Sequence, residues 1–206
     1  MLLAGVKPNS ATFASVLPAC ALMGAFEQGM EIHQKVIESS RCLSDIVANA
    51  LIDMYAKCGS IKKAHQLFNK RYRPSIISWN TMIAGYAMHG YSEEAVKLFE
   101  ILEHSGTCPD HVSFVCVLFA CSHGGLVFYG CKFFNCMSES YGIIPTIDHY
   151  VCMVDLLSHA GYLMETLNFI IKMPTKPDAV VCKSLLGVCR SYKNFEDRRI
   201  CGKNSF

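Results

Sequence analysis

Apolar residues recur along this chain with the period of an α-helix. Ala95, Leu98, Phe99 and Leu102 stand at positions i, i+3, i+4 and i+7, which places them on one face of a helix. The same stripe recurs elsewhere as Ala64, Leu67 and Phe68, as Gly130, Phe133, Phe134 and Met137, and as Phe169, Ile170 and Met173. We therefore expect an all-α protein, in which the small residue that opens each stripe lets two helices approach closely.

The chain also repeats itself. The segment "NALIDMYAKCG" (residues 49–59) is echoed 31 residues later by "NTMIAGYAMHG" (residues 80–90). Five glycines continue this spacing, at steps of 35, 31, 35 and 36 residues: Gly24, Gly59, Gly90, Gly125 and Gly161. A period in this range is typical of helical repeat proteins.

Each repeated unit is predicted to hold two helices around its glycine. In the third unit, Ser78 is a candidate N-cap for a first helix from Trp79 to Met88, and Gly90 supplies the turn because a residue without Cβ adopts positive φ freely. Prolines that stop the second helix close three units: Pro8, Pro109 and Pro177. One helical pair cannot bury both of its faces, so the units must stack into a solenoid.

Composition narrows the classes of function. Of 206 residues, 51% are hydrophobic and 17% charged, which suits a packed core and is too apolar for disorder. The net charge of +2 argues against a protein that binds nucleic acid mainly through a basic surface. The longest apolar run, residues 112–121, is too short to span a bilayer.

Twelve cysteines are present, but no C-x-x-C pair occurs and the cysteines lie within helical patterns. We therefore expect reduced, mostly buried thiols that pack as small hydrophobes, with no metal site and no cofactor.

These repeats resemble the pentatricopeptide repeats (PPR) of plant proteins of the class that mixes long, short and standard units. The segments that carry the resemblance are "NALIDMYAKCGSIKKAHQLF", "SWNTMIAGYAMHGYSEEAVKLF", "HVSFVCVLFACSHGGLV" and "DHYVCMVDLLSHAG". The resemblance implies an α-solenoid of stacked helix-turn-helix repeats wound as a right-handed superhelix. The implied units are residues 10–44 (long), 45–75 (short), 76–110 (standard), 111–146 (long) and 147–178 (short).

The two ends match less completely. Residues 1–9 resemble the end of a preceding repeat, and residues 179–195 resemble the opening of the extension (E) motif that follows the last repeat in this class. That motif departs from the family pattern at Cys182 and Lys193, and residues 196–206 form a diverged tail. The chain is thus expected to be a fragment or a shortened gene product.

The resemblance implies that first helices line a concave side and that successive repeats take successive bases of single-stranded RNA. It assigns uracil recognition to Asn80 with Asp110, and a leaning towards cytosine to Asn49 with Ser75. Aliphatic residues near the start of each repeat would sandwich the bases: Ile46, Ile77 and Val112. The equivalent reading positions in the other units hold side chains that cannot hydrogen-bond a base, namely Ala14, Val115 and Val151, the last paired with Asp178.

Structural interpretations compete with these roles. Asparagine near a helix start often caps the helix, and Asp110 after Pro109 is common turn chemistry. Tyr55 and Tyr86 are expected in the core and not as stacking platforms, and the core is also favoured for Trp79.

Relatives of this class often end in a zinc deaminase-like domain that converts cytidine to uridine. That chemistry needs H-x-E followed by P-C-x-x-C, and neither pattern occurs among the eight histidines and twelve cysteines. The resemblance therefore implies a non-catalytic segment that binds pyrimidine-leaning single-stranded organellar RNA and selects an editing site or guides processing. A deaminase would come from a partner acting in trans.

Two alternatives are a solenoid scaffold for protein–protein interaction, like the tetratricopeptide repeats, and a non-functional remnant. The family implies a mitochondrion or chloroplast, although no transit segment is visible in residues 1–206.

Overall fold

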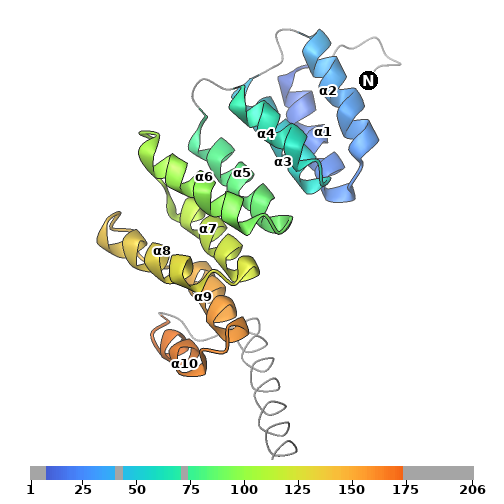
Figure 1. The fold of residues 1–206 in the computed structure, drawn as a ribbon. Helices are drawn as coiled ribbons and strands as arrows, with labels where there is room; N and C mark the ends of the chain where they lie inside the picture. The colour runs from blue at the N-terminus through green and yellow to red at the C-terminus, as the bar shows by residue number, and fades with distance from the viewer. Residues whose placement is uncertain (1–7, 40–43, 71–73, 174–206) are drawn as a thin grey trace, which may run out of the picture.

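The computed structural model describes residues 8–39, 44–70 and 74–173, and their regular structure is entirely α-helical. The helices follow one another as five pairs along an elongated stack (Figure 1). Their bounds are α1 Ser10–Met23, α2 Phe26–Glu38, α3 Asp45–Lys57, α4 Ile61–Asn69, α5 Ile76–Met88, α6 Ser92–His104, α7 His111–Gly124, α8 Val127–Glu139, α9 Ile147–His159 and α10 Leu163–Ile171. The predicted all-α solenoid is confirmed.

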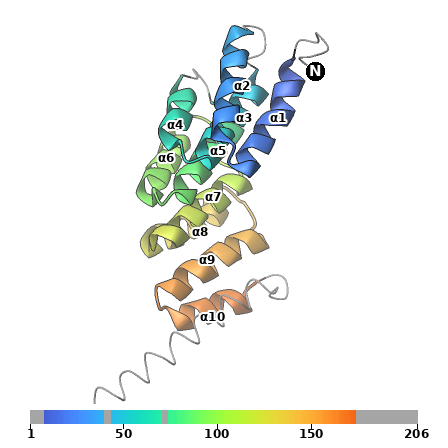
Figure 2. The ribbon, with the colours of Figure 1, turned by 90° about the vertical axis from the view of Figure 1, so that its right-hand side faces the viewer.

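The helices form two layers. Each odd-numbered helix packs directly against the odd-numbered helices of the neighbouring pairs, whereas each even-numbered helix packs mainly on the first helices of its own and the next pair. Figure 2 shows this succession from the side. Because neighbouring first helices lie closer together than neighbouring second helices, the layer made of α1, α3, α5, α7 and α9 is on the inside of the curve. We call it the first-helix layer.

Each first helix is preceded by a capping residue whose side chain contacts the first turn of the helix. The backbone N–H of the third helical residue donates to the side chain of the capping residue in four of these helices, whose caps are Asn9, Ser44, Ser75 and Asp110. In α9 the Thr146 hydroxyl instead contacts the ring of His149 at 2.8 Å. These contacts satisfy polar groups that a helix N-terminus leaves unpaired.

The predicted N-cap of the third unit is wrong. Helix α5 begins at Ile76 and not at Trp79, and Ser75 is its cap, since the Ser78 backbone N–H donates to the Ser75 hydroxyl at 3.3 Å. Two serines three residues apart are both good caps. The helix extends to the earlier one because Ile76 packs against the hydrophobic core.

The glycine turns and the close helix contacts follow the prediction. All five glycines of the ladder have positive φ, as in Gly90 at 77°, a conformation that residues with a Cβ rarely adopt. A Cβ at Gly130 would overlap Leu156 of α9, and one at Gly29 would overlap Met54 of α3. The small residues therefore let second helices rest on the next first helix.

Aromatic side chains fill the space between the layers. Phe99 is fully buried, with its ring centroid 5.1 Å from that of Phe114 and 4.9 Å from that of Phe133. Trp79, 5% exposed, packs edge-on against Phe68, so it belongs to the core.

The two tyrosines behave differently from each other. Tyr55 is buried, as predicted, while Tyr86 is only half-buried. Their hydroxyls pair with ring nitrogens on the preceding second helix, Tyr55 with His33 at 2.8 Å and Tyr86 with His65 at 2.7 Å. Both therefore join neighbouring units.

The eight thiols that the structure describes are free, and three of them are buried, fewer than expected. Cys20, Cys121 and Cys152 are buried, whereas Cys108 is exposed and the other described cysteines are intermediate. None of the described helices is long and apolar enough to cross a membrane.

Several predictions fall outside the described residues. They concern residues 1–7 of the expected preceding repeat, Pro177, Asp178, the E motif over 179–195 and the tail over 196–206. The exact unit boundaries also stay a prediction.

Replacing Phe99 by alanine should destabilise the solenoid strongly. The substitution leaves a cavity between fully buried rings, which typically costs about 3–5 kcal/mol of unfolding free energy. Phe128→Ala is the matched control, because Phe128 is 76% exposed and its loss should change stability by less than about 1 kcal/mol. Urea unfolding of the full chain measures both, and equal effects would contradict this account of the core.

Candidate nucleic-acid interface

Asn80 and Asp110 meet at the junction between the third and fourth helical pairs. Asn80 lies on the second turn of α5, and Asp110 is the N-cap of α7. The Asn80 Nδ2 donates to Asp110 Oδ1 at 3.0 Å, and the Asn80 side chain is largely enclosed, with 8% of the residue exposed. The two residues predicted to act together are thus in direct contact, and Asn80 is not itself a helix cap.

A third residue, Ser113, completes this cluster. Its hydroxyl donates to Asn80 Oδ1 at 2.7 Å, and its backbone N–H donates to Asp110 Oδ1 at 2.9 Å. The backbone N–H of Asp110 donates in return to the Ser113 hydroxyl at 3.1 Å. Because a carboxylate can only accept, the atom of Asn80 that faces Asp110 must be the nitrogen, which fixes the orientation of the amide.

The same contacts hold Asp110 ionised. Burial alone would raise the pKa of Asp110, but hydrogen bonds from the Ser113 backbone and the Asn80 amide, together with nearby His111, bring it below its ordinary value. Because the folded pKa lies below the unfolded one, the carboxylate stabilises the fold at neutral pH. That contribution disappears as the pH falls through the folded pKa.

Asn49 and Ser75 occupy the equivalent junction one unit earlier, but they are linked indirectly. Ser78 donates from its hydroxyl to Asn49 Oδ1 at 2.6 Å and lies 3.1 Å from the Ser75 hydroxyl. Within the described residues, Asn49 and Ser75 are not in direct contact, and no hydrogen-bond partner faces the Asn49 nitrogen. Asn49 is also more exposed than Asn80.

The three predicted sandwiching residues are exposed on the first-helix layer. Ile46, Ile77 and Val112 are each the second residue of their helix, and they are 69%, 60% and 40% exposed. Single exposed aliphatic side chains are common on protein surfaces, but these three recur at the same position of successive first helices.

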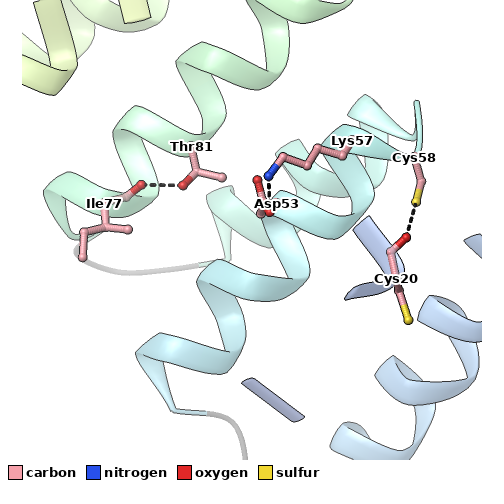
Figure 3. Close-up of polar contacts among 6 residues, drawn as sticks. All are labelled: Cys20, Asp53, Lys57, Cys58, Ile77 and Thr81. Carbon is pink, nitrogen blue, oxygen red and sulfur yellow. Dashed lines mark hydrogen bonds and ion pairs between the residues drawn. The ribbon is translucent and has the colours of Figure 1, made fainter. Parts of the chain in front are cut away.

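The described first helices contain one lysine, Lys57, and no arginine, and that lysine is paired with an acidic side chain. Lys57 reaches back along α3 to Asp53, with Nζ 2.9 Å from Oδ2, and the Thr81 hydroxyl donates to the Ile77 carbonyl within α5 (Figure 3). The Cys58 thiol faces the Cys20 carbonyl of α1. None of these groups adds a free positive charge to the layer.

One other polar cluster lies on the later units. The Ser122 hydroxyl donates to Asp155 Oδ2, and His159 Nδ1 lies 3.3 Å from Asp155 Oδ1. The carboxylate therefore stands between the serine and the histidine, so the imidazole does not accept the serine proton as nucleophilic catalysis would require. Among the described residues no group of three or more His, Cys, Asp or Glu side chains is placed to hold a metal ion.

The sequence missed Ser78 and Ser113 as part of the interface. Each lies three residues after a cap, where a serine is ordinarily interpreted as part of a capping box. The signal that could have found them is their spacing from Asn49 and Asn80, which is 29 and 33 residues and so crosses into the next unit.

Asn80→Ala is expected to raise the pKa of Asp110, because it removes one of the hydrogen bonds that favour the ionised carboxylate. An NMR titration that follows the Asp110 carboxyl carbon through the acidic range measures this shift. Asn49→Ala is the control, since Asn49 does not contact Asp110 and should leave its pKa unchanged. If Asn80→Ala also leaves it unchanged, the contact between the two side chains does not form in solution.

Family models match two stretches of the chain. A model described as the PPR repeat family matches residues 74–123, which include α5, α6 and most of α7, and a PPR repeat model matches residues 46–70. The two stretches hold Asn80, Asp110 and Asn49.

Among curated relatives, the chain is 46% identical over 184 residues to the chloroplastic pentatricopeptide repeat-containing protein DOT4 of Arabidopsis thaliana. It is 45% identical over 191 residues to a mitochondrial pentatricopeptide repeat-containing protein of the same plant. These matches cover 89% and 93% of the chain but only 21% and 30% of the relatives, so the chain spans less than a third of their length.

Among solved structures, the fold resembles pentatricopeptide repeat protein PPR10 in complex with an 18-nt psaJ RNA element. The TM-score is 0.73 at 24% identity, over 82% of this chain and 25% of that chain. At this identity the likeness concerns the fold. Taken with the two family models and the Arabidopsis relatives, it leads to one conclusion: the chain belongs to the pentatricopeptide repeat family.

Proposed function

We propose that the chain binds single-stranded RNA along the first-helix layer and distinguishes bases at two adjacent stations. The first station consists of Asn49 and Ser75, and the second of Asn80 and Asp110. The observation that carries the proposal is the cluster at the second station, where a fixed amide and a carboxylate stand beside exposed aliphatic residues.

The chemistry of the second station favours uracil. Within the described residues no hydrogen bond reaches Asp110 Oδ2, and one Asn80 amide hydrogen is not used. A carboxylate accepts from the N3–H of uracil but repels the N3 lone pair of cytosine. The bases themselves would be held between aliphatic side chains, with Ile46 and Ile77 at the first station and Ile77 and Val112 at the second.

The first station favours cytosine. The Asn49 nitrogen offers two hydrogens to base acceptors, and the Ser75 hydroxyl carries no charge that would repel the cytosine N3. Two stations together select a short pyrimidine-leaning stretch of RNA and no more.

Affinity is expected to be weak. The net charge is +2 and Lys57 is paired with Asp53, so few phosphate contacts can release counterions. Binding should therefore depend on base contacts more than most RNA-binding proteins do, with a shallow salt dependence.

The relatives suggest the setting in which this binding operates. PPR10, whose fold the chain shares, is bound to RNA in its solved complex, and the two Arabidopsis relatives described above are a chloroplastic and a mitochondrial protein. We place this chain in the class that mixes long, short and standard repeats and ends in an E motif. Its role there is organellar RNA processing, as the non-catalytic part that selects a cytidine editing site for a deaminase supplied in trans.

Exchanging the second residue of each station should exchange the base preferences. Asp110→Ser copies the first station into the second and is expected to move the preference there from uracil to cytosine, by about tenfold in relative affinity, or ~1.4 kcal/mol. Ser75→Asp should move the first station from cytosine to uracil by a similar factor. Titration of the full chain against short oligonucleotides with C and U at two adjacent positions measures both.

Removal of a negative charge could raise affinity for every RNA, so Glu93→Ser on the exposed start of α6 is the charge control. It should leave the C-to-U ratio unchanged. If Asp110→Ser, Ser75→Asp and Asn80→Ala all leave base preference as it is in the unaltered chain, the assignment of the two stations is wrong.

A further inference from the structure

Each station includes a serine from the following unit. Ser113, the third residue of α7, donates to Asn80 of α5, and Ser78, the third residue of α5, donates to Asn49 of α3. The two contacts are among the shortest hydrogen bonds in the first-helix layer, at 2.7 and 2.6 Å. The contact between serine and asparagine thus occurs twice.

The single proton of the Ser113 hydroxyl can serve only one acceptor. Asp110 Oδ1 lies 3.0 Å from this hydroxyl, but it already accepts the Asn80 amide and the Ser113 backbone N–H. A carboxylate oxygen has two lone pairs for good hydrogen bonds. The Ser113 proton therefore goes to the closer Asn80 Oδ1, and the amide is held at both ends.

The units of the chain can be compared with one another, because some have asparagine at the reading position and others have an aliphatic residue. Where the reading position is asparagine, the third residue of the next first helix is serine: Asn49 with Ser78, and Asn80 with Ser113. Where the reading position is aliphatic, that residue is not serine, as in Ala14 with Val47 and Val115 with His149. His149 instead bonds the His111 backbone carbonyl and Thr146. The serine accompanies the asparagine and is not a constant feature of the helix start.

We infer that Ser78 and Ser113 are positioning residues for base recognition, which rests on the RNA-binding function proposed above. Each serine occupies the carbonyl oxygen of the asparagine, so that the amide presents its nitrogen to the base. Without the hydroxyl, the Asn49 amide is free to rotate by half a turn and to present an acceptor where a donor is needed. The Asn80 amide is then held only at its nitrogen, by Asp110. Each station is therefore completed by the unit that follows it.

Ser113→Ala should lower base discrimination at the second station by up to about fivefold, since the Asn80 amide loses the partner of its oxygen and is held only by Asp110 at its nitrogen. The first station should keep its preference. Ser78→Ala should do the converse, and Ser113→Thr should retain discrimination, because threonine keeps the hydroxyl and Thr12 already occupies the same position of α1 with a capping box. RNA titrations of the full chain with C or U at each position separate these effects.

Ser92→Ala is the matched control for a lost buried serine. Ser92 is buried, and its hydroxyl has no hydrogen-bond partner in the part of the chain that the structure describes. If Ser92→Ala lowers base discrimination as much as Ser113→Ala, the effect is one of general stability and the inference is overturned. It is equally overturned if Asn80→Ala abolishes discrimination while Ser113→Ala preserves it.

A measurement without RNA separates this inference from the proposed function. In the free chain, the side-chain amide resonances of Asn80 should shift and exchange faster in Ser113→Ala, and should stay near their original values in Ser113→Thr and Ser92→Ala. Unchanged Asn80 resonances in Ser113→Ala would overturn the positioning role, whether or not the chain binds RNA. Shifted resonances in a chain that binds no RNA would support the positioning of the amide and remove the proposed function.

Discussion

The capped start of each first helix is the constraint on which the rest of this structure depends. A helix N-terminus leaves backbone N–H groups without partners, and here the acceptor is the side chain directly before the helix. Asp110 caps α7 with one oxygen and uses that same oxygen to hold Asn80 of α5. One set of contacts thus caps the helix, sets the register between neighbouring units and places a polar group on the first-helix layer.

Packing determines what this layer can display. Gly29 and Gly130 let the second helices rest on the next first helices, and the phenylalanines fill the space behind them. First helices are left side by side, with their opening turns in a row. Ile46, Ile77 and Val112 stay exposed there because the core is already closed without them. A surface of this kind is regular because the stack is regular.

Much of this was predictable from the sequence. The stripe of Ala95, Leu98, Phe99 and Leu102 predicted a helix, and the glycine ladder predicted the turns. The resemblance to pentatricopeptide repeats paired Asn80 with Asp110, and the two are in contact. The start of α5 was not predictable, since Ser75 and Ser78 are equally good caps until the packing of Ile76 decides between them. The roles of Ser78 and Ser113 were hidden because a serine in a first turn serves its own helix in most proteins, and only three-dimensional contact shows that it also serves its neighbour.

The contact between Asn80 and Ser113 has a consequence for how such chains are recombined. A crossover placed at the cap keeps both helical pairs intact, yet it separates the asparagine from the hydroxyl that orients it. A crossover placed after the third residue of the incoming helix transfers them together. A segment transferred between such arrays therefore keeps this contact only if its boundary lies one helical turn inside the next first helix.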